Sequence, residues 1–224
     1  MLLELGGKDC AIVTESADLE MSATEIVSGG FAYSGQRCTA QKIVVAYEKI
    51  AQELKNLLVT KAQALKLTPM INSGACDFNL ELIQDASNKG AEVSLAGVRT
   101  GNILSPTVLF NVNESMRIFA EEQFGPVMPI VVVKDEADAV GKANSTKFGL
   151  QASVYTQGLE EAFRLADKLD VGTVQINGKP DRGPDNFPFG GVKDSGQLMQ
   201  GLTETMELMT RGKLTVINLH AFSK

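Results

Sequence analysis

Apolar residues recur along the first third of the chain with two different spacings. Asp18 stands where it can cap a helix, and apolar positions then repeat every three or four residues over 19–31, the spacing of one helical face. The uninterrupted apolar run at 43–46 predicts a buried strand, and a second helical stripe occupies 50–65. Helix and strand therefore alternate from the start of the chain.

The same alternation continues to residue 177. The spacing predicts further helices at 80–89, 137–144 and 159–169, and further strands at 93–96, 126–134, 152–155 and 173–177. Strands separated by helices of this length predict an α/β fold, with a mostly parallel sheet and helices on both faces. We expect one domain at 1–212 that includes a structured loop at 181–195. A C-terminal strand at 213–219, with its tail to 224, should follow this domain.

Composition and charge exclude several classes of protein. The 224 residues are 44% hydrophobic and 21% charged, as in an ordinary soluble protein, and the formal charge is −6 with both signs interspersed. No basic patch indicates nucleic acid or a membrane surface as a partner. The longest apolar stretch, 126–133, is too short to cross a bilayer, and no secretory leader pattern opens the chain. A cytoplasmic location is therefore expected.

The cysteines and the histidine limit the possible chemistry. Cys10, Cys38 and Cys76 are odd in number and widely spaced, with no CxxC pair, and the chain has one histidine. This set predicts neither a disulfide framework nor a metal site. The histidine, His220, belongs to the tail, where a catalytic imidazole would lack a rigid orienting partner. A thiol enzyme of this composition is therefore expected to use a carboxylate as its base.

Cys38 is the candidate nucleophile. It stands between a predicted helix and a predicted strand, and loops at the ends of a sheet are where α/β folds place chemistry. Arg37 precedes it, and a neighbouring cation favours the thiolate, which is the nucleophilic form. On these residues alone a small core cysteine is an open alternative. We adopt that alternative for Cys10 and Cys76.

Glu4 is the candidate base. Leucines flank it, and a carboxylate in partly apolar surroundings has a raised pKa, which suits a general base near neutral pH. Gly6 and Gly7 follow, so the backbone can approach another segment closely. The alternative is a glutamate at a strand edge before a turn. Nucleotide binding through these glycines is not indicated, because neither GxGxxG nor GxxxxGK[ST] occurs in the chain.

Five motifs taken together, in this order, resemble the aldehyde dehydrogenase superfamily over essentially the whole chain. They are Glu-Leu-Gly-Gly-Lys at 4–8, Gly-Gln-Arg-Cys at 35–38, Glu-Glu-Gln-Phe-Gly-Pro-Val at 121–127, Phe-Gly-Leu-Gln-Ala at 148–152 and Pro-Phe-Gly-Gly-Val-Lys-Asp-Ser-Gly at 188–196. Segments 31–40 and 182–189 are most similar to the non-phosphorylating, NADP-dependent glyceraldehyde-3-phosphate dehydrogenases of that superfamily.

The resemblance implies a catalytic sequence. Cys38 would attack the aldehyde to give a thiohemiacetal, hydride would pass to the nicotinamide of NAD or NADP, and a thioester would remain. Glu4 would then activate water to release the acid. The backbone N–H of Cys38 would supply half of the oxyanion hole.

The resemblance also implies binding residues. Glu122, Phe124 and Gly6 would lie at the cofactor. Arg37 and Arg182 would bind the phosphate of a small phosphorylated aldehyde, glyceraldehyde 3-phosphate, whose oxidation gives 3-phosphoglycerate. Paired guanidinium groups suit a phosphate dianion.

The chain also departs from the family's pattern. The cofactor domain of the family precedes the glutamate motif, whereas this sequence begins at Met1, so residues 1–8 would form the junction with an absent domain. We therefore expect that the chain alone does not oxidise aldehydes. Gln123 and Cys10 stand where proline is common, and the chain is shorter near 67–69; we expect no effect of either substitution on the chemistry.

Two other functions remain open on the sequence alone. The chain could be a split or truncated subunit that acts as an assembly partner, since the apolar strand predicted at 213–219 could pair with a second copy and form a homo-oligomer. It could also be a thiol esterase without a cofactor, using Cys38 and Glu4.

Overall fold

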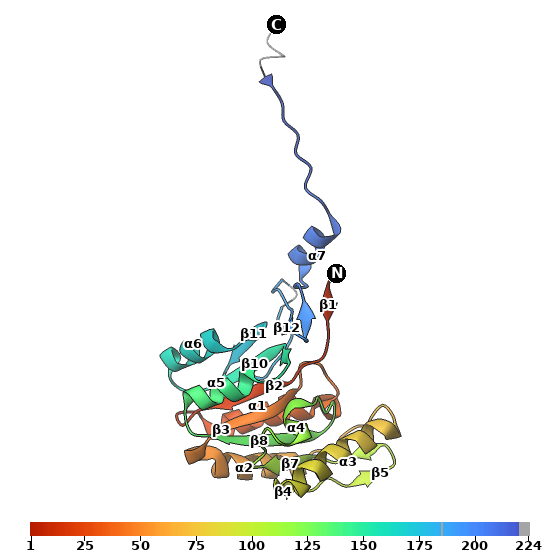
Figure 1. Cartoon of the computed structure of the whole chain (residues 1–224), viewed down its shortest axis with the longest axis vertical. Coiled ribbons are helices and arrows are strands. Elements are labelled where there is room, and N and C mark those ends of the chain that lie inside the picture. The colour runs from red at the N-terminus through yellow and green to blue at the C-terminus, as the bar shows by residue number, and fades with distance from the viewer. Residues whose placement is uncertain (185, 220–224) are drawn as a thin grey trace.

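A seven-stranded sheet forms the centre of the molecule. The computed structural model describes residues 1–184 and 186–219 (Figure 1). The strand order is β11-β10-β2-β3-β8-β7-β4, and every neighbouring pair is parallel except β7 and β4. The strands are β2 (Asp9–Val13), β3 (Gln41–Tyr47), β4 (Glu92–Leu95), β7 (Thr107–Phe110), β8 (Val127–Val133), β10 (Gln151–Tyr155) and β11 (Thr173–Ile176). The expected mostly parallel α/β fold is confirmed.

Helices cover both faces of the sheet. On one face α1 (Leu19–Phe31) and α2 (Glu48–Gln63) pack against alternate residues of β2 and β3. On the other face α3 (Ser73–Asn88), α5 (Glu136–Asn144) and α6 (Leu159–Lys168) pack against the intervening residues. All residues of β2 and β3 are buried, as expected for central strands of a parallel sheet. Two further short helices are α4 (Arg117–Ala120) and α7 (Leu202–Met209).

Capping explains where the helices begin. The Asp18 side chain accepts a hydrogen bond of 3.0 Å from the Met21 backbone N–H, which confirms the predicted cap of α1. Helix α3 begins at Ser73, so the prediction of a start at 80 was wrong. Asn72 caps α3 through a 2.8 Å bond from the Ala75 N–H. In the first two turns of α3 the polar Asn79 is buried where an apolar residue would be expected, so the apolar spacing of the helix is hidden in the sequence.

Two strands of this sheet, β2 and β7, escaped prediction because they are short, with five and four residues. Small strand pairs also join distant segments: β1 (Leu3–Glu4) pairs with β13 (Gly196–Gln197), and β9 (Phe148–Gly149) with β12 (Val192–Lys193). The remaining pair is the hairpin of β5 (Arg99–Thr100) and β6 (Ile103–Leu104). The first pair holds the N-terminal segment against residues 196–197, just after the loop at 181–195, and the second pair holds the end of that loop against β9.

The segment at 213–219 is not a strand in this chain. It runs away from the sheet after α7, and its apolar side chains are exposed (Figure 1). A strand needs a hydrogen-bonding neighbour, and none of the residues that the structure describes provides one here. The prediction of a strand was therefore wrong for the isolated chain, and pairing with a second chain stays a prediction. His220 and the rest of the tail lie outside the described residues. Within the described residues no helix is both long and apolar enough to span a membrane.

Candidate active site

Cys38 lies in the turn that joins the 3-10 helix η1 (Ala32–Gly35) to β3, and its side chain is half-buried. Gly35 shapes this turn. Its φ is +73°, and a Cβ at this position would lie 2.3 Å from the Gly125 carbonyl oxygen. The turn therefore packs directly against the backbone of the 121–127 motif, which brings two motifs of the sequence together.

A lysine that the sequence analysis missed lies beneath the turn. The side chain of Lys42 is 1% exposed, and its ammonium group donates a 2.6 Å hydrogen bond to the Cys38 carbonyl. The same group lies 3.1 Å from Oε1 of Glu122. Buried lysines are rarely unpaired, and this one has two acceptors from different loops. Its only sequence signal is a charge among the apolar residues of a central strand.

The two glycines after Glu4 allow the expected close approach. The Gly7 N–H donates to Oε1 of Glu122 at 3.0 Å. A Cβ on Gly6 would lie 2.3 Å from Oε2 of Glu122, and a Cβ on Gly7 would lie 2.8 Å from the Cys38 carbonyl oxygen. Segment 6–7 therefore fills the space between Glu122 and Cys38, where larger residues would not fit.

Glu4 faces the thiol but is exposed to solvent, so the expected apolar surroundings are absent in this chain. Burial, a hydrogen bond to the Glu4 carboxylate and its negative charge raise the pKa of the Cys38 thiol to about 11, and the positive charge of Lys42 partly opposes them. The expectation that Arg37 would make a thiolate favourable was wrong. Its guanidinium group lies 3.5 Å from the Asp181 carboxylate and donates to the Thr39 hydroxyl at 3.0 Å instead.

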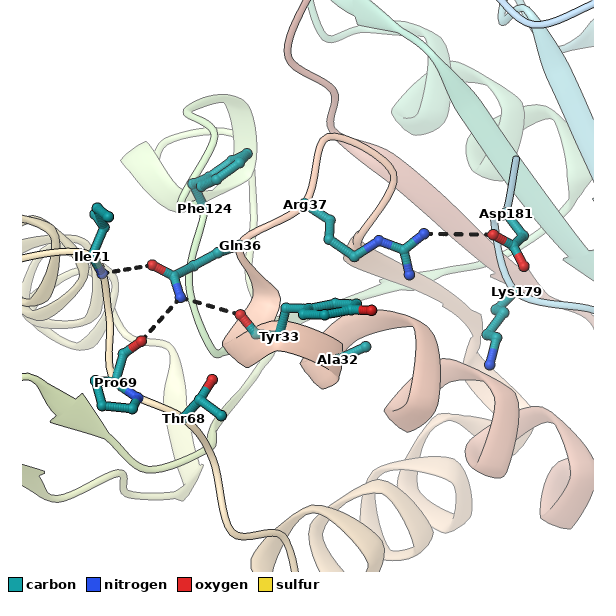
Figure 2. A pocket seen from close by; sticks show the side chains of 10 residues that line it. All are labelled: Ala32, Tyr33, Gln36, Arg37, Thr68, Pro69, Ile71, Phe124, Lys179 and Asp181. Carbon is teal, nitrogen blue, oxygen red and sulfur yellow. Dashed lines mark hydrogen bonds and ion pairs between the residues drawn. The ribbon is translucent and has the colours of Figure 1, made fainter. Parts of the chain in front are cut away.

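A cavity of about 1020 Å³ opens beside the turn. Figure 2 shows Arg37 reaching toward Asp181 on one side of it, with Lys179 nearby and the Phe124 ring on the opposite side. Gln36 fixes the floor, because its amide donates to the carbonyls of Tyr33 and Pro69 and accepts from the Ile71 N–H. The cavity is lined by Ala32, Tyr33, Gln36, Arg37, Thr68, Pro69, Ile71, Phe124, Lys179 and Asp181.

Arg182 does not line this cavity, so the expected pair of guanidinium groups is absent from it. Its guanidinium lies 5.8 Å from the centre of the Phe189 ring, in a separate groove of about 580 Å³ against α7. The Asp181 side chain accepts from the Arg182 N–H while it faces Arg37, and the chain turns away at this point. Lys179 stands beside Arg37 where Arg182 was expected. Asp185, from the same Arg-Gly-Pro-Asp motif, lies outside the described residues.

Gln123 is more closely tied to the site than the sequence indicated. Its side chain is buried, and its amide nitrogen donates at 2.8 Å to the carbonyls of Lys42 and Val127. Its oxygen accepts at 2.5 Å from the Lys8 ammonium, which also donates to the carbonyls of Ile118 and Glu121. Burial and the charge of Lys42 lower the Lys8 pKa well below its usual value. Gln123 therefore holds the backbone of Lys42, while the expectation that this substitution does not affect the chemistry stays a prediction.

The other two cysteines are core residues, as expected. Cys10 and Cys76 are both buried, and burial raises the pKa of the Cys10 thiol. Asp9, beside Cys10, is also buried, and burial raises its pKa to about 8; its Oδ1 accepts a 3.1 Å hydrogen bond from the Gln151 N–H. Of the three thiols, Cys38 is the one that is not buried.

The residues expected at a cofactor are compatible with a nicotinamide ribose. The Glu122 side chain is 19% exposed, and both of its fixing contacts, from Gly7 and Lys42, use Oε1. A carboxylate held in this way can accept hydrogen bonds from ribose hydroxyls. The Phe124 ring is 42% exposed on the cavity wall, where a planar group could pack against it. The Glu122 carboxylate, as an acceptor, and the exposed Phe124 ring fit the group that the motif implies.

Comparison with known proteins identifies the family. The model of the aldehyde dehydrogenase family matches residues 1–215. NADP-dependent glyceraldehyde-3-phosphate dehydrogenase of Pisum sativum is 43% identical over 226 residues, 97% of this chain and 46% of that protein. The enzyme of that name from Streptococcus equinus is 44% identical over 232 residues, 98% of this chain and 48% of that protein.

Solved structures agree with the sequence matches. The NADP complex of NADP-dependent glyceraldehyde-3-phosphate dehydrogenase from Bacillus halodurans superposes with a TM-score of 0.95 at 45% identity, covering 97% of this chain and 48% of that one. The NADP complex of glyceraldehyde-3-phosphate dehydrogenase GapN from Methanocaldococcus jannaschii gives 0.88 at 32% identity, covering 93% and 47%. The chain thus spans about half the length of the relatives it matches.

Proposed function

The chain belongs to the aldehyde dehydrogenase family, and we propose that it supplies the catalytic thiol of an NADP-dependent enzyme that oxidises glyceraldehyde 3-phosphate to 3-phosphoglycerate. The observation that carries the proposal is the Cys38 turn. Its thiol faces Glu4, its carbonyl is fixed by Lys42, and the cavity beside it is lined by Arg37 and Lys179.

The first step is addition of the Cys38 sulfur to the carbonyl carbon of the aldehyde. The Glu4 carboxylate, which faces the thiol, takes its proton, and the bond electrons of the carbonyl move to oxygen. The Cys38 N–H donates to this oxygen and stabilises the charge that develops there. Because the pKa of the thiol is about 11, little thiolate exists at neutral pH, and proton transfer to Glu4 must accompany the attack.

The second half of the reaction releases the acid. NADP⁺, when bound, supplies the acceptor for the hydride that leaves the substrate carbon. Glu122 would accept hydrogen bonds from the ribose hydroxyls, and the Phe124 ring would contact the cofactor. The acyl group then remains on the Cys38 sulfur as a thioester. Glu4, which is exposed, first releases to solvent the proton that it took from the thiol. It then takes a proton from water as the oxygen of that water attacks the acyl carbon, and it passes this proton to the Cys38 sulfur as the acid leaves.

The charge of the cavity supports a phosphorylated substrate. Arg37 and Lys179 both line it, and the Lys179 ammonium donates to the Ser28 hydroxyl at 2.8 Å, which fixes its position. A phosphate dianion would compete with Asp181 for the Arg37 guanidinium, since guanidinium groups bind phosphate by two charged hydrogen bonds. Arg182 would take part only after a rearrangement of its loop.

The test is selective modification of the purified chain with a mild thiol-reactive electrophile, with Cys38→Ser as the control variant. We expect Cys38 alone to be modified, and glyceraldehyde 3-phosphate to slow its modification. Cys76→Ser is the matched control, because that thiol is buried and its loss should leave the labelling unchanged. Equal labelling of the wild-type chain and of Cys38→Ser would contradict the proposal.

A second candidate function, assembly with another chain, has its own observation. Leu214 on the C-terminal segment is 87% exposed, and Met209 on α7 is 82% exposed. Apolar side chains gathered on one exposed segment indicate a surface that binds another chain. Gel filtration measures the oligomeric state of the chain, which is compared with that of a variant ending at residue 210. Equal monomeric elution of both would exclude pairing through this segment.

A further inference from the structure

One ammonium group joins three parts of the active site. The buried Lys42 side chain donates to the Cys38 carbonyl at 2.6 Å and lies 3.1 Å from Glu122. It also lies 5.7 Å from the centre of the Phe124 ring, within the range of a cation–π contact. Its neighbours are therefore the residue proposed as nucleophile and the two residues proposed to hold the cofactor.

We propose that Lys42 is a positioning residue of this active site: its ammonium group fixes the Cys38 turn relative to Glu122 and supplies the positive charge beside the thiol. The proposal rests on the proposed function of Cys38. It assigns to Lys42 the electrostatic role that was expected of Arg37, whose guanidinium faces Asp181 and Thr39 instead.

The backbone around Lys42 leaves its ammonium little freedom. Lys42 lies in β3, between β2 and β8 in the centre of the sheet. The Gln123 amide holds its carbonyl at 2.8 Å, and the neighbouring Gln41 amide donates to the Tyr155 hydroxyl at 2.8 Å. Because the Lys42 ammonium group is already held in place, it can act on the Cys38 thiol without a cost for ordering it during the reaction.

A merely structural role does not account for this charge. Ion pairs in a protein interior are often no more stabilising than apolar residues of the same volume, because desolvation offsets the attraction. A methionine at 42 would fill the same space in β3. A methionine would provide neither a donor for the Cys38 carbonyl nor a positive charge that acts on the thiol and on Glu122.

Charged groups from every neighbouring segment act on this site. Glu4 from β1 raises the pKa of the thiol and Lys42 lowers it. Glu122 from the 121–127 loop pairs with Lys42, and Lys8 and Asp9 at the start of β2 lie close enough to sense its charge. Arg37 acts on Asp9 but is not among the causes that shift the thiol. Lys42 is therefore the cation among the causes that shift the pKa of the thiol.

The experiment is the rate of alkylation of Cys38 by iodoacetamide, a neutral probe, from pH 7 to 11. It compares the wild-type chain with Lys42→Met and Lys42→Arg. In Lys42→Met we expect the apparent pKa of the thiol to rise by about 0.5–1 unit. The variant loses the attraction between the ammonium group and the thiolate, and at an effective dielectric constant near 20 the negative charge of Glu122 already cancels part of that attraction. Alkylation at pH 8 should slow by about 3–10-fold. Lys42→Arg keeps the charge and should restore the wild-type profile to within about twofold.

Lys55→Met is the matched control. Lys55 is also a buried lysine paired with a carboxylate, at 2.9 Å from Glu92, but it belongs to α2, away from the turn. Its loss should leave the profile of Cys38 unchanged. A shift of equal size in Lys55→Met would mean that the effect is a general loss of rigidity, and would overturn the proposal.

The remaining outcomes separate this proposal from the proposed function. If wild-type Cys38 does not react, the proposed function fails and the role of Lys42 fails with it. If Cys38 reacts and Lys42→Met leaves its profile unchanged, only the role of Lys42 fails. Should circular dichroism show that Lys42→Met is unfolded, Glu122→Gln provides the test. It leaves the lysine charge uncompensated, so the apparent pKa of the thiol should fall, and a constant or raised value would overturn the proposal.

Discussion

Substituting alanine for Gly35 tests how the nucleophile turn is built. Gly35 has a φ of +73°, and an added Cβ would lie 2.3 Å from the Gly125 carbonyl oxygen and 2.7 Å from the Gly125 carbonyl carbon. A left-handed conformation costs an L-residue about 1–2 kcal/mol, and the reduced freedom of the unfolded chain returns about 0.4–1 kcal/mol of it. The collision is with backbone, which cannot rotate away, and overpacking of this kind costs about 1–3 kcal/mol.

The hairpin glycine Gly101 is the matched control. Its φ is +61°, but nothing lies within 4 Å of an added Cβ, so Gly101→Ala carries only the conformational cost. We expect Gly101→Ala to lower the free energy of unfolding by about 0.5–1 kcal/mol and Gly35→Ala by about 2–4 kcal/mol. For a chain of this size each kcal/mol shifts the melting temperature by about 2–4 °C.

The assay is thermal unfolding followed by circular dichroism, together with the rate of Cys38 alkylation. Gly35→Ala should melt about 4–16 °C below the wild-type chain, and Gly101→Ala about 1–4 °C below it. Because the displaced backbone is that of Gly125, next to Phe124, Gly35→Ala should also change the alkylation rate of Cys38, whereas Gly101→Ala should not. Equal melting temperatures for the two variants would refute the argument that close packing of the turn on the 121–127 loop sets its geometry.

Three further predictions follow from buried groups. Gln123→Ala removes the partner of Lys8 and of two backbone carbonyls, so the free energy of unfolding in urea should fall by about 2–4 kcal/mol. The control Gln157→Ala, at an exposed position, should lower it by about 0.5 kcal/mol or less, and similar losses in the two variants would contradict the buried network. Burial raises the pKa of Asp9 from its ordinary 3.8 to about 8, so between these values the folded state binds a proton that the unfolded state does not, and this group makes the protein less stable as the pH rises from 4 to 8. Asp9→Asn should therefore gain stability relative to wild type at pH 8 compared with pH 5 in urea titrations; a constant difference would show that Asp9 does not titrate there. Cys10 and Cys76 should react with an electrophile only after unfolding, and mass spectrometry of the labelled native chain should find the label on Cys38; label on either buried cysteine would count against the described core.

The sequence by itself determined the architecture and the family. Apolar periods of two kinds predicted the α/β class and most helices and strands, because burial on one or two faces leaves its spacing in the chain. The five ordered motifs identified the aldehyde dehydrogenase family, and the turn around Cys38 could be placed at the end of the sheet. The core positions of Cys10 and Cys76 also agreed with the structure.

The tertiary structure alone decided which groups surround the thiol. Gly7 meets Glu122 across 115 residues of sequence, and Gln123 meets the backbone of Lys42 across 81. No local pattern records such pairs, since parallel strands bring segments that are far apart in the sequence to the same edge of a sheet. Arg37 seemed the natural cation for Cys38 because it is adjacent in sequence, but in the fold its side chain reaches Asp181.

The same reason explains the other corrections. Glu4 is exposed and Arg182 lies in another groove, because the path of the folded backbone decides which segments lie beside each of them. The apolar residues at 213–219 have the pattern of a strand, but they have no strand neighbour within residues 1–184 and 186–219. A sequence records how much of each segment is buried, because burial acts residue by residue, whereas the partner of a buried charge depends on where the backbone of another segment passes.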